Sequence, residues 1–347
     1  MIRVIDGGIQ SSIQDKGRYG YQELGISSSG VMDDWSYRLA NVLVANEEEA
    51  ACIEVTYGGL CLGFELDMEI SITGAIVAAK LNGHPVPMNE TVYVQCGDKL
   101  ELGYALRGVY SYVGFSKALD IRAVLGSCST DITSGIGGLE GRVLRQGDSI
   151  PVKDSAYTLL EKRCVPEALQ IKLQDEAEIQ VLEGLEFERF TEKSQIIFMS
   201  SIFEVSQTCS RMGYRLKGDF IQSIDGNDIL STGLTRGTIQ GTASGELIIM
   251  MSDHQSTGGY TRIGHVITCD QPALAQLRTG SKVNFKVVSL EEAHCLLREK
   301  EKEFKRWLET LSPRKQCHAI AKRFKLCINN KYFTVKVDLL SNKEGGQ

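Results

Sequence analysis

The chain has 347 residues and a formal net charge of −6. At about 150 residues per domain, this length predicts two domains, each large enough to bury its own core. The acidic balance argues against a nucleic-acid partner, because nucleic-acid binders usually carry a clustered basic face. Residues Met1 to Asp6 lack an apolar targeting segment, and no apolar run approaches the roughly 20 residues of a membrane helix. We therefore expect a cytoplasmic protein without a membrane partner.

From Met1 to about Leu290, short apolar runs alternate with glycine-rich turns, a pattern typical of β-barrels or sandwiches. Runs such as Glu69 to Ile72, Ile76 to Leu81 and Thr91 to Val94 predict half-buried strands, and Asn82-Gly83 predicts a hairpin turn. In the second half of the chain, runs that include Ile196-Ile197-Phe198 continue this pattern. The sequence predicts a mainly β protein.

One helix interrupts the strands early in the chain. Asp33 can cap its amino end, and apolar side chains recur at helical spacing from Trp35 to Leu43. A carboxylate at this position is already useful against the helix dipole, so Asp33 serves either as a cap or as part of a site.

The polar stretch from Pro151 to Pro166 indicates a linker between domains. We predict a first domain over residues 1–163, a second over residues 164–290 and a carboxyl-terminal extension over residues 291–347. In the extension, Ser289 and Glu292 form a capping box for a charged amphipathic helix that ends before Pro313. Residues Arg323 to Val337 then alternate as a hairpin around Asn329-Asn330, followed by a polar tail.

The cysteines, ten in number, are scattered without a C-x-x-C pair, a spacing that favours reduced thiols. The five histidines form no close ligand set, so we expect neither a disulfide nor a metal. No G-x-x-x-x-G-K-[ST] loop is present, and no G-x-G-x-x-G follows a strand. If ATP is used, no standard loop of this chain holds it, and it binds between subunits or on partner subunits.

A polar run framed by glycines, Ser252 to Tyr260, directly follows the apolar run Leu247 to Met251. It offers a carboxylate, an imidazole, an amide, hydroxyls and a phenol, and its paired glycines allow close backbone approach. A hydrogen-bonded hairpin loop is the alternative. Four polar motifs stand out together: Gln14-Asp15-Lys16-Gly17-Arg18, Ser29-Gly30-Val31-Met32-Asp33, Ser210-Arg211-Met212-Gly213-Tyr214-Arg215-Leu216, and Gly237-Thr238-Ile239-Gln240 with the run Asp253 to Tyr260.

In order and spacing these motifs resemble the family called allophanate hydrolase subunit 2, also known as the C subunit of 5-oxoprolinase. Supporting matches are Glu54-Val55-Thr56-Tyr57-Gly58-Gly59 and Gly126-Ser127-Cys128-Ser129-Thr130. The resemblance covers residues 1 to about 290. It implies two cyclophilin-like β-barrel domains with a cleft between them. It also implies a partner like the B subunit of 5-oxoprolinase (subunit 1 in the other nomenclature), and in some systems a protein like the A subunit.

The resemblance leaves three functions open. The leading one is a subunit of an ATP-dependent 5-oxoprolinase-type amidohydrolase that opens 5-oxoproline to glutamate and acts only with its partner subunits. The first alternative is a regulatory binding protein that antagonises a kinase inhibitor. The second is a carboxyltransferase subunit of a urea carboxylase or allophanate hydrolase type of system.

Two features depart from the family pattern. The family reads Ser-Asp-Arg where this chain has Cys209-Ser210-Arg211, so a hydroxyl replaces a carboxylate beside the arginine and weakens the expectation of full catalytic activity. The terminal hairpin resembles the opening strands of a biotinyl carrier domain, yet no Ala-Met-Lys-Met motif follows it. We therefore expect no covalently attached biotin. The terminal hairpin is either a remnant of a carrier domain or an ordinary edge hairpin.

The candidate reactions act on planar amide-like groups, which requires groups that hold a carboxylate, polarise a carbonyl and move a proton. The acid–base candidates are Asp15, Asp253 and His254. Asp15 could instead form a turn salt bridge, His254 could be a hydrogen-bonded loop residue, and the arginines could form interdomain ion pairs. The candidates for substrate binding are Gln14, Arg18, Ser29, Asp33, Arg211, Arg215, Gln240, Gln255, Thr257 and Tyr260.

Overall fold

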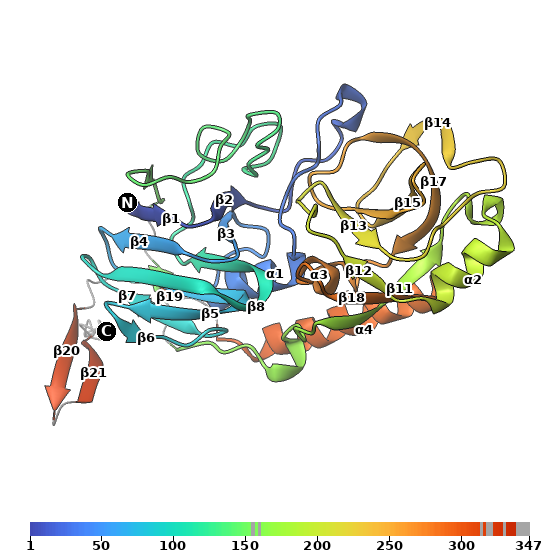
Figure 1. Cartoon of the computed structure of the whole chain (residues 1–347). Helices are drawn as coiled ribbons and strands as arrows, with labels where there is room; N and C mark the ends of the chain where they lie inside the picture. The colour runs from blue at the N-terminus through green and yellow to red at the C-terminus, as the bar shows by residue number, and fades with distance from the viewer. Residues whose placement is uncertain (154–156, 159–160, 313–314, 317–321, 329–330, 338–347) are drawn as a thin grey trace, which may run out of the picture.

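The computed structural model describes residues 1–153, 157–158, 161–312, 315–316, 322–328 and 331–337. Two large β-sheets lie side by side, with short helices between them and one long helix that runs beneath the sheet of the second half to the junction of the two (Figure 1). The expected mainly β fold is therefore confirmed. We refer to residues 1–163 as the first half and to residues 164–290 as the second half; these predicted boundaries remain a working division of the chain.

Nine strands of the first half form a sheet that curves as a half-barrel. The two long central strands, β5 and β8, pair with each other, and β8 also pairs with β3 and β4. The strands are β1 (Ile2–Gly7), β2 (Gln10–Gln14), β3 (Cys52–Thr56), β4 (Leu60–Phe64), β5 (Met68–Leu81), β6 (His84–Pro85), β7 (Thr91–Val94), β8 (Lys99–Phe115) and β9 (Ser149–Ile150).

The runs predicted as two separate strands before Asn82 form the single strand β5. Gly74 sits where the register of β5 against β8 shifts, and its φ of +86° suits a glycine. A Cβ at this position would lie 2.4 Å from the Tyr110 carbonyl oxygen. The glycine lets the strand bend without ending. Asn82 and Gly83 both have positive φ and join β5 to β6, which confirms the predicted hairpin turn.

The sheet of the second half closes into a barrel of seven strands, because β11 pairs with β18 on one side and with β17 on the other. An eighth strand, β14, pairs with β17. The strands are β11 (Glu176–Glu183), β12 (Phe203–Val205), β13 (Gly213–Lys217), β14 (Asp228–Gly233), β15 (Thr238–Gly241), β16 (Leu247–Met250), β17 (Thr257–Val266) and β18 (Lys282–Val287).

The strand interpretation was wrong for Ile196-Ile197-Phe198, which lies in helix α2 (Glu192–Ser200). Thr191 caps this helix by accepting a hydrogen bond from the Ser194 amide. Phe198 is fully buried and stacks on Phe285 at a centroid distance of 4.8 Å, while Ile196 remains exposed. A short apolar run carries no reliable period, and here the cap and the one-sided burial decide for a helix.

The predicted early helix is α1 (Asp34–Leu43), and the Asp33 side chain caps it by accepting from the Ser36 amide. Helix α4 (Leu290–Thr310) begins with the predicted capping box. Both predictions are confirmed, as is the terminal hairpin of β20 (Lys322–Ile328) and β21 (Lys331–Val337); its turn residues, Asn329 and Asn330, and the polar tail lie outside the described residues. The remaining elements are β10 (Tyr157–Thr158), β19 (Lys315–Gln316), α3 (Gln271–Ala275) and the 3-10 helices η1 (Gln22–Leu24), η2 (Glu167–Leu169) and η3 (Phe187–Arg189).

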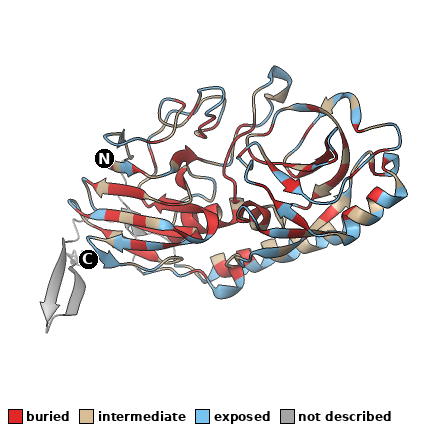
Figure 2. Ribbon diagram, viewed as in Figure 1, coloured by how far each residue is buried: buried red, intermediate tan, exposed pale blue. Residues whose placement is uncertain are grey.

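Apolar burial ties the two halves together. Figure 2 shows buried positions concentrated in both sheets and in α1. One core cluster combines Tyr37, Tyr110 and Tyr112 of the first half with the barrel interior of the second. A further cluster packs α1 against α4, with Phe304 of α4 at a centroid distance of 5.3 Å from Trp35. The contact between the halves is therefore a continuous core, and polar groups within it are fixed in position.

Candidate active site

The loop from Ser27 to Asp33 lies at the contact between the halves and is strained. Ser29 has a φ of +51° and Gly30 a φ of +89°. A Cβ on Gly30 would lie 2.7 Å from the Lys16 carbonyl oxygen, so this position requires glycine. Ser252 of the second half donates to the Val31 carbonyl at 2.9 Å, and Arg236 donates to the carbonyls of Val31 and Met32. The second half thus holds the backbone of this loop in place.

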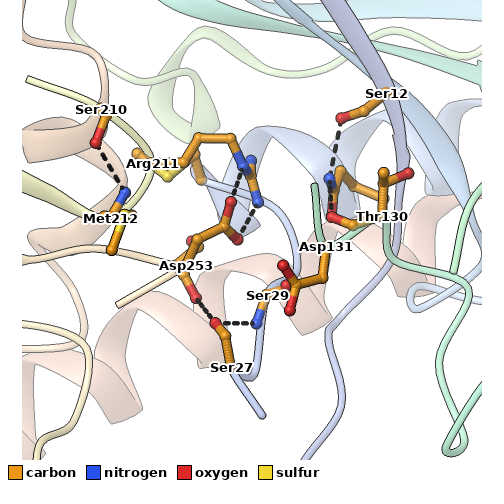
Figure 3. A network of polar contacts seen from close by, with 12 residues as sticks. Ser12, Ser27, Ser29, Thr130, Asp131, Ser210, Arg211, Met212 and Asp253 are labelled. Atoms are coloured by element: carbon orange, nitrogen blue, oxygen red, sulfur yellow. Dashed lines mark hydrogen bonds and ion pairs between the residues drawn. The ribbon is translucent and has the colours of Figure 1, made fainter. Parts of the chain in front are cut away.

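Arg211 joins the halves through a buried ion-pair network with Glu54 and Asp253. Figure 3 shows its pair with Asp253. Its Nε and Nη2 donate to the two oxygens of Asp253 at 2.7 and 2.9 Å. Its Nη1 donates to Glu54 of β3, and its Nη2 also donates to the Gly30 carbonyl at 2.5 Å. All three guanidinium nitrogens are engaged within the protein, so Arg211 and Asp253 act together as a clamp between the halves.

Burial raises the pKa of the Glu54 carboxyl, and Arg211, the Met32 amide and the Tyr112 hydroxyl oppose that rise. Burial alone would lower the pKa of Arg211, but Asp253 and Glu54 hold it well above its usual value. The guanidinium therefore stays charged. Ser210, which stands where the family has a carboxylate, is exposed; its hydroxyl accepts from the Met212 amide at 3.2 Å, and its amide donates to the Gly213 carbonyl at 3.1 Å. The arginine finds its carboxylates elsewhere in the fold.

A pocket of about 410 Å³ opens beside this clamp, between the two halves. Its walls come from the loop after β1, from β3 and β8, from the loop around Ile132, and from the segment Gln207 to Met212. Arg211 and Asp253 form part of its lining, and Ile9, Ile132 and Met212 contribute exposed apolar surface. A concave pocket with apolar walls and a few converging polar groups is the usual form of a small-molecule site.

Asp15 acts as a structural anchor between loops of the first half. One carboxylate oxygen accepts from the Gly17 amide and from the Ser127 and Ser129 hydroxyls, and the other accepts from the Cys128 amide. These four hydrogen bonds hold the loop that begins at Ser127 against the loop that contains Asp15. The arrangement suits a positioning residue better than a general base.

Gln14 and Arg18, on either side of Asp15, are almost completely buried, with exposures of 0% and 1%. Gln14 Nε2 donates to Ser12 Oγ at 2.9 Å and to the Thr130 carbonyl at 3.1 Å. Arg18 Nη2 donates to the Ser129 carbonyl. Burial lowers the pKa of Arg18, and Asp131 and Asp15 oppose that effect. The alternative of a turn salt bridge to Arg18 is not what the structure shows, since the Asp15 carboxylate is engaged by Gly17, Ser127, Cys128 and Ser129.

Asp33 is buried and serves both the fold and the contact between the halves. Its Oδ1 caps α1, and its Oδ2 accepts from Gln276 Nε2 at 2.7 Å. Gln276 follows α3 of the second half and also accepts from the Val109 and Tyr110 amides. Burial raises the pKa of Asp33 to about 6, against the opposing hydrogen bonds from Gln276 and Ser36. Asp33 therefore titrates within reach of neutral pH.

The remaining predicted residues are spread over the second half. His254 is buried, its Nδ1 lies 2.7 Å from the Gln255 carbonyl, and burial lowers the pKa of its imidazole. Gln240 is buried and donates to the Tyr260 carbonyl at 3.0 Å. Gln255 and Thr257 are exposed, and Tyr260 is half-buried in β17. Arg215 lies on the exposed side of β13 beside Glu246 at 3.6 Å, outside the described lining of the pocket.

Sequence reasoning did not assign a role to Glu54, Asp131, Gln276 or Arg236, all of which lie at or near the contact between the halves. Glu54 carried a usable signal, because it is a carboxylate inside the otherwise apolar run Cys52 to Val55. Gln276 and Arg236 carried none, since their roles depend on segments more than 160 residues away in the chain.

Residues 24–287 match the carboxyltransferase domain, subdomains A and B, and the chain belongs to this family. The predicted family is therefore confirmed. The chain is 37% identical over 293 residues to the C subunit of 5-oxoprolinase from Escherichia coli, covering 84% of this chain and 93% of that protein. It is 36% identical over 301 residues to the C subunit of 5-oxoprolinase from Haemophilus influenzae, covering 87% of this chain and 96% of that protein.

The fold is also similar to a segment of much longer proteins. The crystal structure of Kluyveromyces lactis urea carboxylase matches with a TM-score of 0.82 and 27% identity, over 88% of this chain and 29% of that chain. Urea amidolyase of Saccharomyces cerevisiae is 30% identical over 309 residues, which are 83% of this chain and 17% of that protein. The chain thus corresponds to one part of these larger proteins.

Proposed function

We propose that this chain is the carboxyltransferase-type subunit of an ATP-dependent 5-oxoprolinase, which opens 5-oxoproline to glutamate together with partners like the B and A subunits of that enzyme. The observation that carries the proposal is the similarity to the C subunit of 5-oxoprolinase from E. coli, of which this chain spans 93%. The name of that relative implies partner subunits, and the pocket between the halves offers a place for a small substrate.

The roles of the residues follow from their surroundings. Arg18 has guanidinium donors left over for a substrate carboxylate, whereas the donors of Arg211 are engaged by Asp253, Glu54 and the Gly30 carbonyl. Arg211 would hold the two halves of the site together. ATP, when bound, supplies the free energy for opening the lactam, and we assign its binding to the partner subunits or to an interface with them because this chain has no standard phosphate-binding loop.

A second function has support of its own. The match to K. lactis urea carboxylase covers 88% of this chain, which favours carboxyl transfer to a urea-like acceptor as the alternative. In that case the carboxyl donor would be biotin on a separate carrier protein. Both functions place a planar amide-like group in the site, and they differ in whether ATP hydrolysis by the partners depends on 5-oxoproline.

The test is ATP hydrolysis by this chain mixed with its A-type and B-type partners, with and without 5-oxoproline. We expect 5-oxoproline to stimulate turnover and glutamate to accumulate. An Arg18→Gln variant should lower kcat/KM by at least about a hundredfold, since it removes a charged contact. Arg145→Gln is the matched control, because Arg145 is exposed. A stable complex without 5-oxoproline-dependent turnover would contradict the proposal and favour carboxyl transfer or the regulatory alternative.

A further inference from the structure

Four buried side chains at the contact between the halves keep polar atoms without a hydrogen-bond partner among the residues that the structure describes. We call Gln14, Arg18, Ser29 and Asp131 the polar cluster. Their exposures are 0%, 1%, 4% and 1%. The atoms concerned are Gln14 Oε1, Arg18 Nε and Nη1, Ser29 Oγ and Asp131 Oδ2.

Such atoms are costly when they stay unpaired. A buried polar group without a partner costs about 1–3 kcal/mol, and a charged group costs more. Native proteins contain only a few unsatisfied buried polar groups per 100 residues, and each one asks for an explanation. Here four of the residues concerned, including an arginine and an aspartate, lie at the end of β2 and on nearby loops.

The surrounding hydrogen bonds fix the orientation of the cluster. Asp131 Oδ1 accepts from the Thr133 and Ser134 amides at 3.0 Å, which leaves Oδ2 as its unpaired oxygen. The Arg18 amide donates to the Ser28 carbonyl at 2.8 Å. In Figure 3 the Asp131 carboxylate points toward the loop of Ser27 and Ser29. These loops are locked together, so the unpaired atoms are held in a preorganised arrangement.

The unpaired atoms define what they can bind. Arg18 supplies donors, while Gln14 Oε1 and the carboxylate oxygen Asp131 Oδ2 are acceptors. Asp131 is close enough to influence the Arg18 guanidinium, yet the two form no ion pair within the described residues. A ligand that satisfies both must present acceptor oxygens to the arginine and N–H groups to the acceptors. A lactam or amide that also carries a carboxylate has this pattern.

We propose that Asp131 and Gln14 accept hydrogen bonds from the N–H group of an amide-type ligand whose carboxylate binds Arg18. The choice of a lactam as the ligand rests on the proposed function. The pattern of donors and acceptors is independent of that function. Ile132 and Thr133, which follow Asp131 directly, line the pocket beside Arg211 and Asp253. The four residues of the polar cluster themselves lie outside the lining of this pocket. In this proposal Asp131 is a specificity residue that distinguishes N–H from a ring oxygen.

The experiment compares 5-oxoproline with two analogues, each of which differs from it by one group. The analogues are its lactone isostere 5-oxotetrahydrofuran-2-carboxylate, and 2-pyrrolidinone, which lacks the carboxylate. Dissociation constants are measured by calorimetry on the full chain, alone and with its partner subunits. Wild type should bind 5-oxoproline at least about tenfold more tightly than either analogue, since each analogue loses a buried hydrogen-bonded contact.

The variants separate the two contacts. Asp131→Asn keeps the oxygen that accepts from Thr133 and Ser134 but turns the second position into a donor, so the preference for lactam over lactone should disappear. Arg18→Gln should remove the preference for 5-oxoproline over 2-pyrrolidinone, and Arg18→Lys replaces it if the first variant fails to fold. Asp6→Asn is the matched control, because Asp6 forms a similar turn bond to the Gly8 amide on the exposed surface.

The outcomes distinguish this proposal from the proposed function. If the complex turns over 5-oxoproline but Asp131→Asn and the Arg18 variants keep both preferences, the polar cluster is not the ligand site, although the proposed function stands. If turnover is absent but binding depends on Asp131 and Arg18 as described, the ligand site stands and the proposed function fails. If no probe binds, ordered water alone satisfies the polar cluster, and this proposal is overturned.

Discussion

Arg211 of the second half and Glu54 of the first form an ion pair in which the side chains are only 7% and 1% exposed. Asp253 completes the network from the arginine's own half. In addition, Glu54 accepts from the Met32 amide at 2.7 Å and from the Tyr112 hydroxyl at 2.8 Å. One carboxylate thus connects the loop before α1, the central strand β8 and the second half. Such fully bonded buried charges define a fixed arrangement more than they add stability.

Glu54→Gln tests this clamp. Removing one charge of a buried network leaves its partner incompletely compensated, so we expect a loss of about 3–5 kcal/mol in the free energy of unfolding. Urea denaturation followed by circular dichroism measures it. The matched control is Arg215→Gln, which breaks a pair whose side chains are 46% and 47% exposed and should change stability by less than about 1 kcal/mol. Equal losses in the free energy of unfolding for the two substitutions would show that burial does not determine how much the ion pair contributes to stability.

Asp33 predicts a pH dependence of stability. Its folded-state pKa of about 6 lies above the ordinary 3.8, so the folded protein binds the proton more tightly than the unfolded chain. The resulting stabilisation is fully present below about pH 4 and is lost as the pH rises through 6, in total on the order of 3 kcal/mol. Denaturation of wild type and Asp33→Asn at several pH values isolates it. A stability difference between them that is constant from pH 4 to pH 7 would contradict the burial effect.

Helix α4 should contribute to stability through its contact with α1. Phe304 is fully buried, packs on Trp35 and lies 4.3 Å from the Arg38 guanidinium, which also pairs with Glu301 of α4. Phe304→Ala should cost about 3–5 kcal/mol through lost burial and the cavity it leaves. Thermal unfolding measures the loss. Lys302→Ala, an exposed position of the same helix, should be nearly neutral; a similar loss at both positions would indicate an effect on helix propensity instead.

Gly137 and Gly135 form a matched pair on the loop around Arg18. Both have positive φ, but a Cβ on Gly137 would lie 2.0 Å from the Ser129 carbonyl oxygen and 2.6 Å from Arg18 Nη2, whereas the space around Gly135 is open. Gly135→Ala should cost about 1 kcal/mol from backbone strain alone. Gly137→Ala should cost clearly more and should also weaken ligand binding, because it displaces Arg18. Calorimetric binding and thermal unfolding of both variants check this, and equal results would exclude a steric role for Gly137.

Local patterns in the sequence predicted much of the fold. The Asp33 cap, the capping box at Ser289, the turn at Asn82-Gly83 and the terminal hairpin follow from interactions within a few residues, which the order of residues specifies directly. The short run Ile196 to Phe198 was misassigned because three residues carry no period.

The candidate site, like the fold, has features that the sequence predicted and features that it did not. The sequence by itself determined the family, the mainly β fold and the motifs that supply Gln14, Arg18 and Arg211. Only the tertiary structure decided that Arg211 is engaged by Glu54 and Asp253, that Arg215 faces solvent, and that Asp131 stands near Arg18. The physical reason is that the use of a charge depends on its burial and on partners distant in the chain, 42 residues for Arg211 with Asp253 and 157 for Arg211 with Glu54, which strand pairing and core packing bring together.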